Sequence, residues 1–225
     1  MKYQPDSHKK RWIVYFDLLG IRKMISEGKE VQVFAAYKHA LEQFGHHKTW
    51  APSLEHGWFS DSFLILAPDD SKDSFGRIDL MARYFVNTML IAKIPLRGAI
   101  SCGDMYVDPA EKVFLGKGLV EAYEYGEGQD WIGLLLCPTA TERLESLGMM
   151  PDPSDYKLWR IPWKRQPEGA PHDLFACFVG KVVLLGGHNP RIESLEEMMS
   201  GVSREDQRVK YERTMAFLRR NERIS

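Results

Sequence analysis

One apolar segment that ends in an acid constrains the fold more than any other feature of the sequence. Residues 11–17 read RWIVYFD, rich in β-forming residues and almost wholly apolar after the arginine. A segment of this kind predicts a central strand that is buried on both faces. The turn Leu18-Leu19-Gly20 follows directly. We therefore expect Asp17 to lie at the end of a central strand, immediately before a tight turn.

Strand and helix patterns alternate along the rest of the chain. Apolar residues recur at helical spacing over 31–44 and 78–92, which predicts two long helices. Glycine, proline and aspartate separate these segments from runs that are rich in β-branched and aromatic residues. The further strands are predicted over 58–67, 95–103, 131–136, 156–163 and 174–179, and shorter helices over 117–127 and 139–147.

The chain of 225 residues is long enough for one well-buried domain, and no linker-like stretch marks a second one. We expect a domain over 11–180 and a C-terminal extension over 181–225. The extension contains a predicted helix that Ser203 caps, with Tyr211, Met215 and Leu218 along one face. That apolar stripe requires a surface to pack against.

The composition excludes several classes of function. The formal net charge is -1, so the chain lacks the basic surplus of a nucleic-acid-binding domain. No apolar stretch approaches the roughly 20 residues of a membrane span, and the N-terminus does not resemble a secretory signal. Three widely spaced cysteines without a CxxC pair predict buried free thiols. We expect a cytoplasmic protein that binds neither nucleic acid nor membrane.

Two aspartates lie in unusually apolar surroundings. Asp17 ends the first strand, and Asp61 falls inside the apolar segment 58–67, predicted as a strand. A buried carboxylate without a partner costs several kcal/mol, and two of them on adjacent strands repel each other unless a cation lies between them. Mn²⁺ or Mg²⁺ suits such oxygen ligands. The pattern predicts a divalent-metal site.

The turn after Asp17 predicts the other half of that site. The backbone N–H groups of Leu18, Leu19, Gly20 and Ile21 can bind phosphate where a helix begins. A simpler interpretation remains open, in which Asp17 only caps the turn and Asp61 faces solvent from an edge strand.

Four motifs occur together in one order. They read YFDLLGI, FSDSF, LRGAISCG and FLGKGLVEAYE, and over about residues 13–137 they resemble the class III nucleotidyl cyclase catalytic domain. The resemblance implies an α+β fold with a ferredoxin-like (palm) βααββαβ core. It also implies a homodimer with its sites at the subunit interface, and two Mn²⁺ or Mg²⁺ ions per site, bound by Asp17, Leu18 and Asp61.

The same four motifs are most similar to those of the pyrimidine cyclases of bacterial Pycsar antiphage defence. This similarity implies synthesis of cyclic UMP from UTP, with cyclic CMP from CTP as the second choice, as a messenger in antiphage defence. Purine cyclases place a base-reading lysine where this chain has Gly57, which fits a different base.

Arg97 is the candidate catalytic cation beside the two aspartates, with a structural ion pair as the alternative. Tyr123 and Tyr125 are candidates for a dimer surface. Trp58 is a candidate for stacking on the base, although a core position is the simpler interpretation. The residues expected to contact the nucleotide are Phe16, Leu18, Leu19, Gly20, Ile21, Trp58, Ser60 and Ser62.

Two other functions fit the same residues. A palm-type nucleotidyltransferase uses two acids to transfer a nucleotide to another molecule. A non-catalytic sensor binds the nucleotide and signals through its C-terminal helix. The products formed with Mn²⁺ distinguish all three functions.

Overall fold

The strand β1 (His8–Leu18) lies in the middle of one mixed sheet, paired antiparallel with β3 (Ser62–Leu66) and with β4 (Leu96–Asp108). The computed structural model describes residues 8–46, 54–108, 111, 113–177 and 190–222. Every residue from Trp12 to Leu18 is buried. The prediction of a central strand covered on both faces is confirmed.

The sheet has eight strands in the described part of the chain, in the order β2-β3-β1-β4-β6-β8-β7, with β5 paired to β4. All the ladders are antiparallel except β4 with β6, which is parallel. The remaining strands are β2 (Glu55–Phe59), β5 (Val113–Leu115), β6 (Gly133–Leu136), β7 (Tyr156–Arg160) and β8 (Asp173–Cys177).

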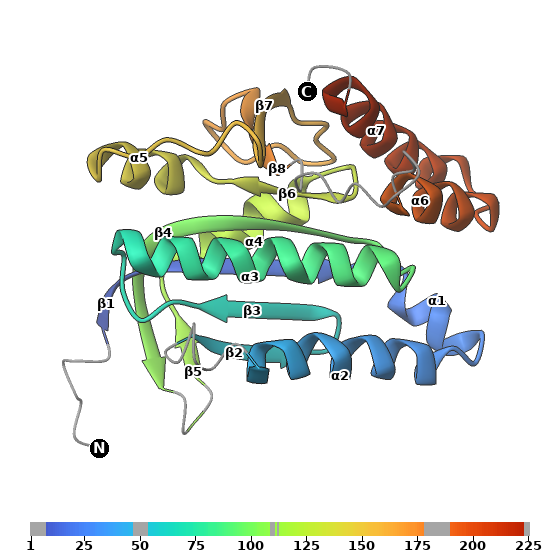
Figure 1. Cartoon of the computed structure of the whole chain (residues 1–225), viewed down its shortest axis with the longest axis horizontal. Coiled ribbons are helices and arrows are strands. Elements are labelled where there is room, and N and C mark those ends of the chain that lie inside the picture. The colour runs from blue at the N-terminus through green and yellow to red at the C-terminus, as the bar shows by residue number, and fades with distance from the viewer. Residues whose placement is uncertain (1–7, 47–53, 109–110, 112, 178–189, 223–225) are drawn as a thin grey trace.

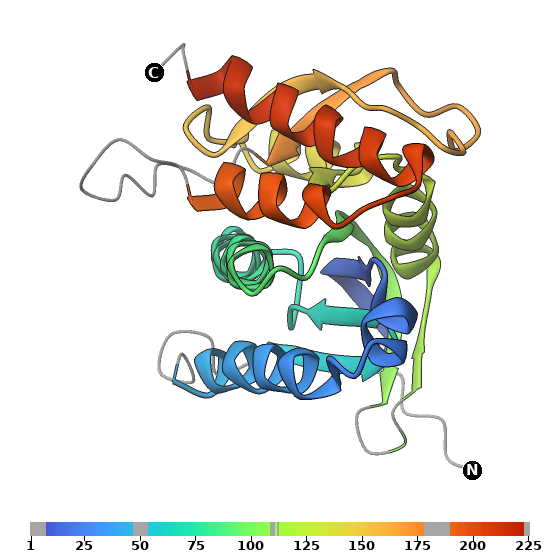
Figure 2. The same ribbon diagram turned by 90° about the vertical axis from the view of Figure 1, so that its right-hand side faces the viewer.

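Helices cover both faces of the sheet (Figures 1 and 2). The long helix α3 crosses β1 and β4 on one side, beside α2, and α4 packs against β1 and β4 on the other. The order from β1 to β4 is β1-α1-α2-β2-β3-α3-β4, the expected βααββαβ core. The helices are α1 (Ile21–Ser26), α2 (Glu30–His46), α3 (Lys72–Ile91), α4 (Lys117–Gly128), α5 (Pro138–Ser146), α6 (Pro190–Ser200) and α7 (Glu205–Glu222).

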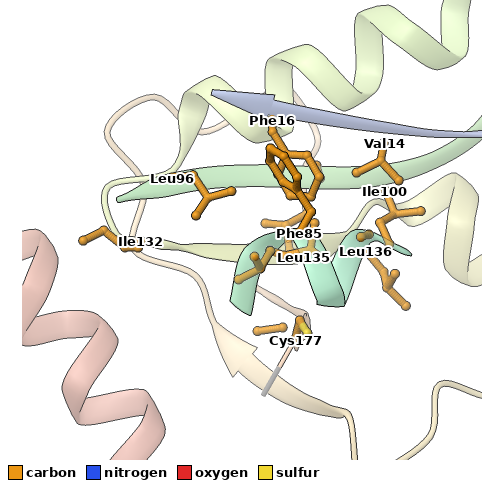
Figure 3. Packing of buried hydrophobic residues seen from close by; sticks show 14 of the residues in the cluster. Val14, Phe16, Phe85, Leu96, Ile100, Ile132, Leu135, Leu136 and Cys177 are labelled. Atoms are coloured by element: carbon orange, nitrogen blue, oxygen red, sulfur yellow. The ribbon is translucent and has the colours of Figure 1, made fainter. Parts of the chain in front are cut away.

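Alternate residues of β1 build two separate cores. Val14 and Phe16 face α3, where the ring of Phe16 lies 4.8 Å from that of Phe85 (Figure 3). Ile13 and Tyr15 face α4 instead and belong to a smaller apolar cluster. The period-2 alternation of a strand therefore places Asp17 on the same side as Tyr15, facing α4.

One predicted strand is divided in two. The segment 58–67 was expected to run continuously, but Ser60 and Asp61 form the tight turn of the hairpin between β2 and β3. Ser60 has a φ of 55°, in the left-handed region. The apolar residues on both sides concealed the turn, because Ser60, Asp61 and Ser62 form only a short polar run between two aromatic residues.

The C-terminal helix α7 packs into the main core. The ring of Phe217 lies 5.1 Å from that of Trp131 and 5.0 Å from that of Trp159. Tyr211, Met215 and Leu218 are buried in the same cluster. The helix therefore packs against the sheet around β6 and β7, and α6 packs between it and α3. The predicted domain boundary near residue 181 lies outside the described residues.

Polar contacts fix α7 to the segment before β6. Asp130 forms ion pairs with both Lys210 and Arg213. The Thr214 hydroxyl accepts a hydrogen bond from the N–H of Ile132 at 2.9 Å. The residues 130–132 are therefore held by side chains that lie about 80 residues further along the chain.

The burial of the cysteines and the hydropathy of the described helices were both considered in the predictions from composition. Cys102, Cys137 and Cys177 are buried and form no disulfide. Burial raises the pKa of the Cys102 thiol to about 12, so this cysteine is unreactive at neutral pH. Among the described residues, no helix is long and apolar enough to span a bilayer.

A buried acid joins α3 to β7. Asp79 accepts hydrogen bonds from the Tyr156 hydroxyl at 2.5 Å and from Arg83 Nε at 3.0 Å. The Arg83 Nη1 atom also lies 2.9 Å from Asp155. Asp79 and Tyr156 are both buried, so water does not compete for the hydrogen bond between them.

We expect Asp79→Ala to lower the free energy of unfolding by about 3–5 kcal/mol, because it leaves a buried hydroxyl and a guanidinium without their acceptor. Asp155→Ala is the control, since Arg83 keeps its inner partner there, and a loss of about 1 kcal/mol is expected. Urea denaturation followed by circular dichroism measures both. Equal losses in the two variants would contradict this account.

Candidate functional site

The fold brings Asp17 and Asp61 together. Asp17 lies opposite Ser62 in the β1–β3 ladder, and the N–H of Leu18 donates to the carbonyl of Asp61 at 2.8 Å. Asp61 lies in the hairpin turn and not inside a strand, so its side chain is partly exposed while that of Asp17 is buried. The turn thus places Asp61 at the end of β1 with its carboxylate open to a ligand.

The turn after Asp17 offers fewer unpaired N–H groups than the sequence suggested. The N–H of Leu18 donates to Asp61, and the N–H of Leu19 donates to the carbonyl of Pro95 at 2.8 Å. Both N–H groups are therefore used as donors within the fold, and phosphate binding by Leu18 and Leu19 stays a prediction. Gly20 has a φ of 75° and is the N-cap of α1. The N–H groups of Gly20 and Ile21, at the start of that helix, remain candidates.

Arg97 is bound on three sides. Its Nε lies 2.8 Å from Asp17 Oδ2, its Nη1 donates to the carbonyl of Gln129 at 2.7 Å, and its Nη2 lies 2.6 Å from Glu127 Oε2. Arg97 is buried. The arginine predicted to lie beside the aspartates thus contacts Asp17 directly and links it to the end of α4.

The sequence did not single out Glu127, Gln129 or Tyr15 as parts of this site. The Tyr15 hydroxyl lies 3.1 Å from Glu127 Oε1 and 3.1 Å from Ser62 Oγ. Gln129 is fully buried and donates through its side chain to the carbonyl of Gly98 at 2.9 Å. A glutamate between two glycines, Gly126 and Gly128, was the one local signal that could have drawn attention to this position.

The electrostatics of Asp17 favour a bound cation. Burial raises the pKa of Asp17, the nearby charges of Glu127 and Asp61 raise it further, and Arg97 lowers it. The balance is a raised pKa, because burial and the neighbouring acids together oppose ionisation more than Arg97 favours it. An added divalent cation would favour the ionised form.

The donor set fits a magnesium-type site. Within the described residues, no group of three or more histidine, cysteine or acidic side chains has the geometry of a metal cage. The available ligands are the carboxylates of Asp17 and Asp61, which leaves coordination positions for water and for substrate oxygens. Mg²⁺ and Mn²⁺ bind in this way, through one or two carboxylates plus phosphates, whereas zinc requires nitrogen or sulfur ligands.

A groove of about 980 Å³ opens beside the aspartates. Its walls come from β1, β2, β3, β5, α2 and α4, and its lining is largely apolar. Tyr15 and Ser62 lie in its wall and connect it to the Arg97 contacts. The other lining residues on this side are Glu55, Gly57, Phe59, Leu64, Phe114, Leu119, Val120 and Tyr123.

Two of the expected nucleotide contacts have rings that pack against other aromatic rings. The ring of Phe16 is fully buried against Phe85, so only its backbone is near the site. The ring of Trp58 lies 3.6 Å from that of Tyr37 and 4.5 Å from that of Phe63. Trp58 reaches the groove from the α2 side with its faces covered by these rings, so its position argues against stacking on a base.

Gly126 allows the end of α4 to approach the sheet. A Cβ atom at this position would lie 2.7 Å from Tyr15 Cδ1, closer than packing permits. The contact fixes the position of Glu127, which follows immediately. Gly76 in α3 offers a matched comparison, because a Cβ atom there would meet nothing within 4 Å.

We expect Gly126→Ala to reduce the free energy of unfolding by about 1–3 kcal/mol, because the new methyl group overlaps the ring of Tyr15. Gly76→Ala should instead stabilise the protein by about 0.5–1 kcal/mol, since alanine is the better helix former. Thermal and urea denaturation of both variants measure the difference. Stabilisation by Gly126→Ala would show that α4 does not need this close approach.

Comparison with solved structures identifies the fold. No family model and no curated protein matches the sequence. Among solved structures, the guanylate cyclase domain from Catenaria anguillulae in complex with GTP superimposes with a TM-score of 0.54 at 10% identity, over 75% of this chain and 96% of that one. The adenylate cyclases of Trypanosoma brucei give a TM-score of 0.54 at 10% identity, over 83% and 95%. The adenylyl cyclase CyaB of P. aeruginosa gives 0.52 at 10% identity, over 76% and 94%. The chain therefore has the fold of class III nucleotidyl cyclase catalytic domains.

Proposed function

We propose that this protein is a nucleotide cyclase that converts a ribonucleoside triphosphate into a cyclic mononucleotide and pyrophosphate. The observation that carries the proposal is the meeting of Asp17 and Asp61, which the hydrogen bond from Leu18 to the Asp61 carbonyl holds at the end of β1. The fold that surrounds the two acids is that of guanylyl and adenylyl cyclase domains.

In the proposed reaction the 3′-hydroxyl oxygen of the ribose attacks the α-phosphorus. The bond from that phosphorus to the bridging oxygen breaks, pyrophosphate leaves with that oxygen, and the hydroxyl proton passes to solvent. Two Mn²⁺ or Mg²⁺ ions, when bound, supply the charge that lowers the pKa of the hydroxyl and stabilises the leaving group.

The residues of this chain bind and orient the reactants. Asp17 and Asp61 hold the ions through their carboxylates, with Leu18 proposed as a further ligand. Arg97 fixes the orientation of the Asp17 carboxylate through its Nε contact. Gly20 and Ile21 offer N–H groups to phosphate oxygens at the start of α1.

We propose a pyrimidine as the base, with UTP favoured over CTP. The motif resemblance to pyrimidine cyclases supports this choice, and the groove is consistent with it. A Cβ atom on Gly57 would lie 3.2 Å from the ring of Phe114, so Phe114 occupies the space beside the position where purine cyclases carry their lysine. The product would then be cyclic UMP, a cytoplasmic messenger in antiphage defence.

The decisive test is incubation of the protein with each of the four ribonucleoside triphosphates and Mn²⁺, with products identified by mass spectrometry. We expect cyclic UMP and pyrophosphate from UTP, and less cyclic CMP from CTP. Asp17→Asn and Asp61→Asn should each remove detectable product, because each deletes a metal-binding charge. Asp73→Asn, at an exposed position in the first turn of α3, is the control that should keep activity.

Three results would contradict the proposal. A dinucleotide or an extended primer would indicate a nucleotidyltransferase. Binding of triphosphate without turnover would indicate a sensor. Full activity of the Asp17 or Asp61 variant would show that the metal site lies elsewhere.

We also propose that the groove is completed by a second copy of the chain. Large apolar side chains stand exposed around it, with Phe59 at 83%, Val120 at 52% and Tyr123 at 51% exposure. An exposed apolar rim of this kind marks an interaction surface. A two-fold axis would bring the same surface of each copy together, as the cyclase resemblance implies.

Val120→Glu should convert the protein to a monomer and reduce its turnover, because it places a charge in the apolar contact. Leu158→Glu is the control, since Leu158 is 62% exposed on β7 at the other edge of the sheet. Light scattering after size-exclusion chromatography gives the oligomeric state. A wild-type monomer that is fully active would refute the dimer proposal.

A further inference from the structure

We propose that Glu127 is a positioning residue, which binds Arg97 so that this arginine orients Asp17 without neutralising it. The proposal rests on the proposed function, in which Asp17 and Asp61 hold divalent cations. It adds a third acid, contributed by the end of α4, that acts on the cations through Arg97.

The geometry of the guanidinium is the first argument. An arginine alone with a carboxylate commonly binds it with two parallel N–H groups. Arg97 gives Asp17 only its Nε, because Nη2 is taken by Glu127 and Nη1 by the Gln129 carbonyl. Within the described residues, Asp17 Oδ1 accepts no hydrogen bond, so Glu127 and Gln129 keep one oxygen of Asp17 available.

The charge balance is the second argument. The carboxylates of Asp17 and Glu127 contact one guanidinium, and the charge of Asp61 acts on Asp17, so three acids and one guanidinium leave an excess of two negative charges. Without Glu127 the excess falls to one, and the full charge of Arg97 faces Asp17. The Arg97 and Asp17 side chains are only 7% and 10% exposed, while that of Glu127 is 34% exposed, so water screens the charge of Glu127 only in part.

Glu127 is itself fixed in place. Its Oε1 accepts a hydrogen bond from the Tyr15 hydroxyl, and its Oε2 lies against Arg97. The backbone on either side is close-packed, because a Cβ atom on Gly128 would lie 2.4 Å from the carbonyl oxygen of Arg165 and one on Gly126 would overlap Tyr15. A side chain held at both oxygens and on both flanks has a defined position relative to Asp17.

The test measures Mn²⁺ binding to the nucleotide-free protein, from the loss of the free Mn²⁺ signal in electron paramagnetic resonance. Glu127→Gln keeps the size and one of the two hydrogen-bond acceptors but removes the charge. We expect it to bind Mn²⁺ about tenfold more weakly than the wild type, which corresponds to about 1.4 kcal/mol. Glu127→Asp, which keeps the charge, should stay within about threefold of the wild type.

Glu124→Gln is the matched control, because it removes the same charge from an exposed position one turn earlier on α4. Its Mn²⁺ affinity should stay within about twofold of the wild type, since a solvent-exposed charge is screened. Thermal melting of each variant confirms that it is folded.

Unchanged Mn²⁺ affinity in Glu127→Gln would overturn the proposal, and so would an equal loss in Glu124→Gln. Failure of the wild type to bind Mn²⁺ in a manner that depends on Asp17 would overturn it as well. Normal Mn²⁺ binding with the predicted loss in Glu127→Gln, but without a cyclic product, would support this role of Glu127 while rejecting the cyclase reaction.

Discussion

The burial of an ionised side chain at the end of β1 is the constraint on which the site depends. Asp17 lies on a strand whose two faces are covered, by α3 on one side and α4 on the other. A carboxylate in that position requires compensating charge, and the fold supplies it from β4 through Arg97. Arg97 in turn requires acceptors, which come from α4 and from the segment that follows it. Each requirement brings another element to the site.

The sequence could predict the elements whose signals are local. The apolar run of β1, the helical spacing of α3 and the acid before a glycine turn each follow from a few adjacent residues, and the βααββαβ order follows from their succession. The site needs contacts between residues that are far apart. Arg97 contacts Asp17 across 80 residues, Gln129 across 32 and Glu127 across 30, and no periodicity in the sequence encodes these pairs. The hairpin turn at Asp61 was missed for the opposite reason, because its neighbours alone favour a continuous strand.

The differences between the expected and the observed surroundings of the candidate site also have physical causes. The N–H groups of Leu18 and Leu19 seemed available because they follow a strand, but the hairpin and the residue before β4 use them as donors. Trp58 seemed suited to a ligand because it precedes Asp61, but strand alternation turns its side chain toward α2 and Tyr37. Neighbouring residues of a strand point to opposite faces of the sheet, so adjacent side chains contact different surfaces. The cyclases above are only 10% identical to this chain, so they do not predict the positions of these individual side chains.

The attachment of α7 has a practical consequence for work with this protein. Asp130, which Lys210 and Arg213 bind, is the residue next to Gln129, whose carbonyl holds Arg97. The last described helix thus contacts the residue next to Gln129, whose carbonyl helps to hold Arg97 beside Asp17. Shortened versions that end before α7 would lose the ion pairs with Asp130 and disturb the centre of the molecule. Affinity tags and fused reporters should therefore be attached where they do not disturb the packing of α7.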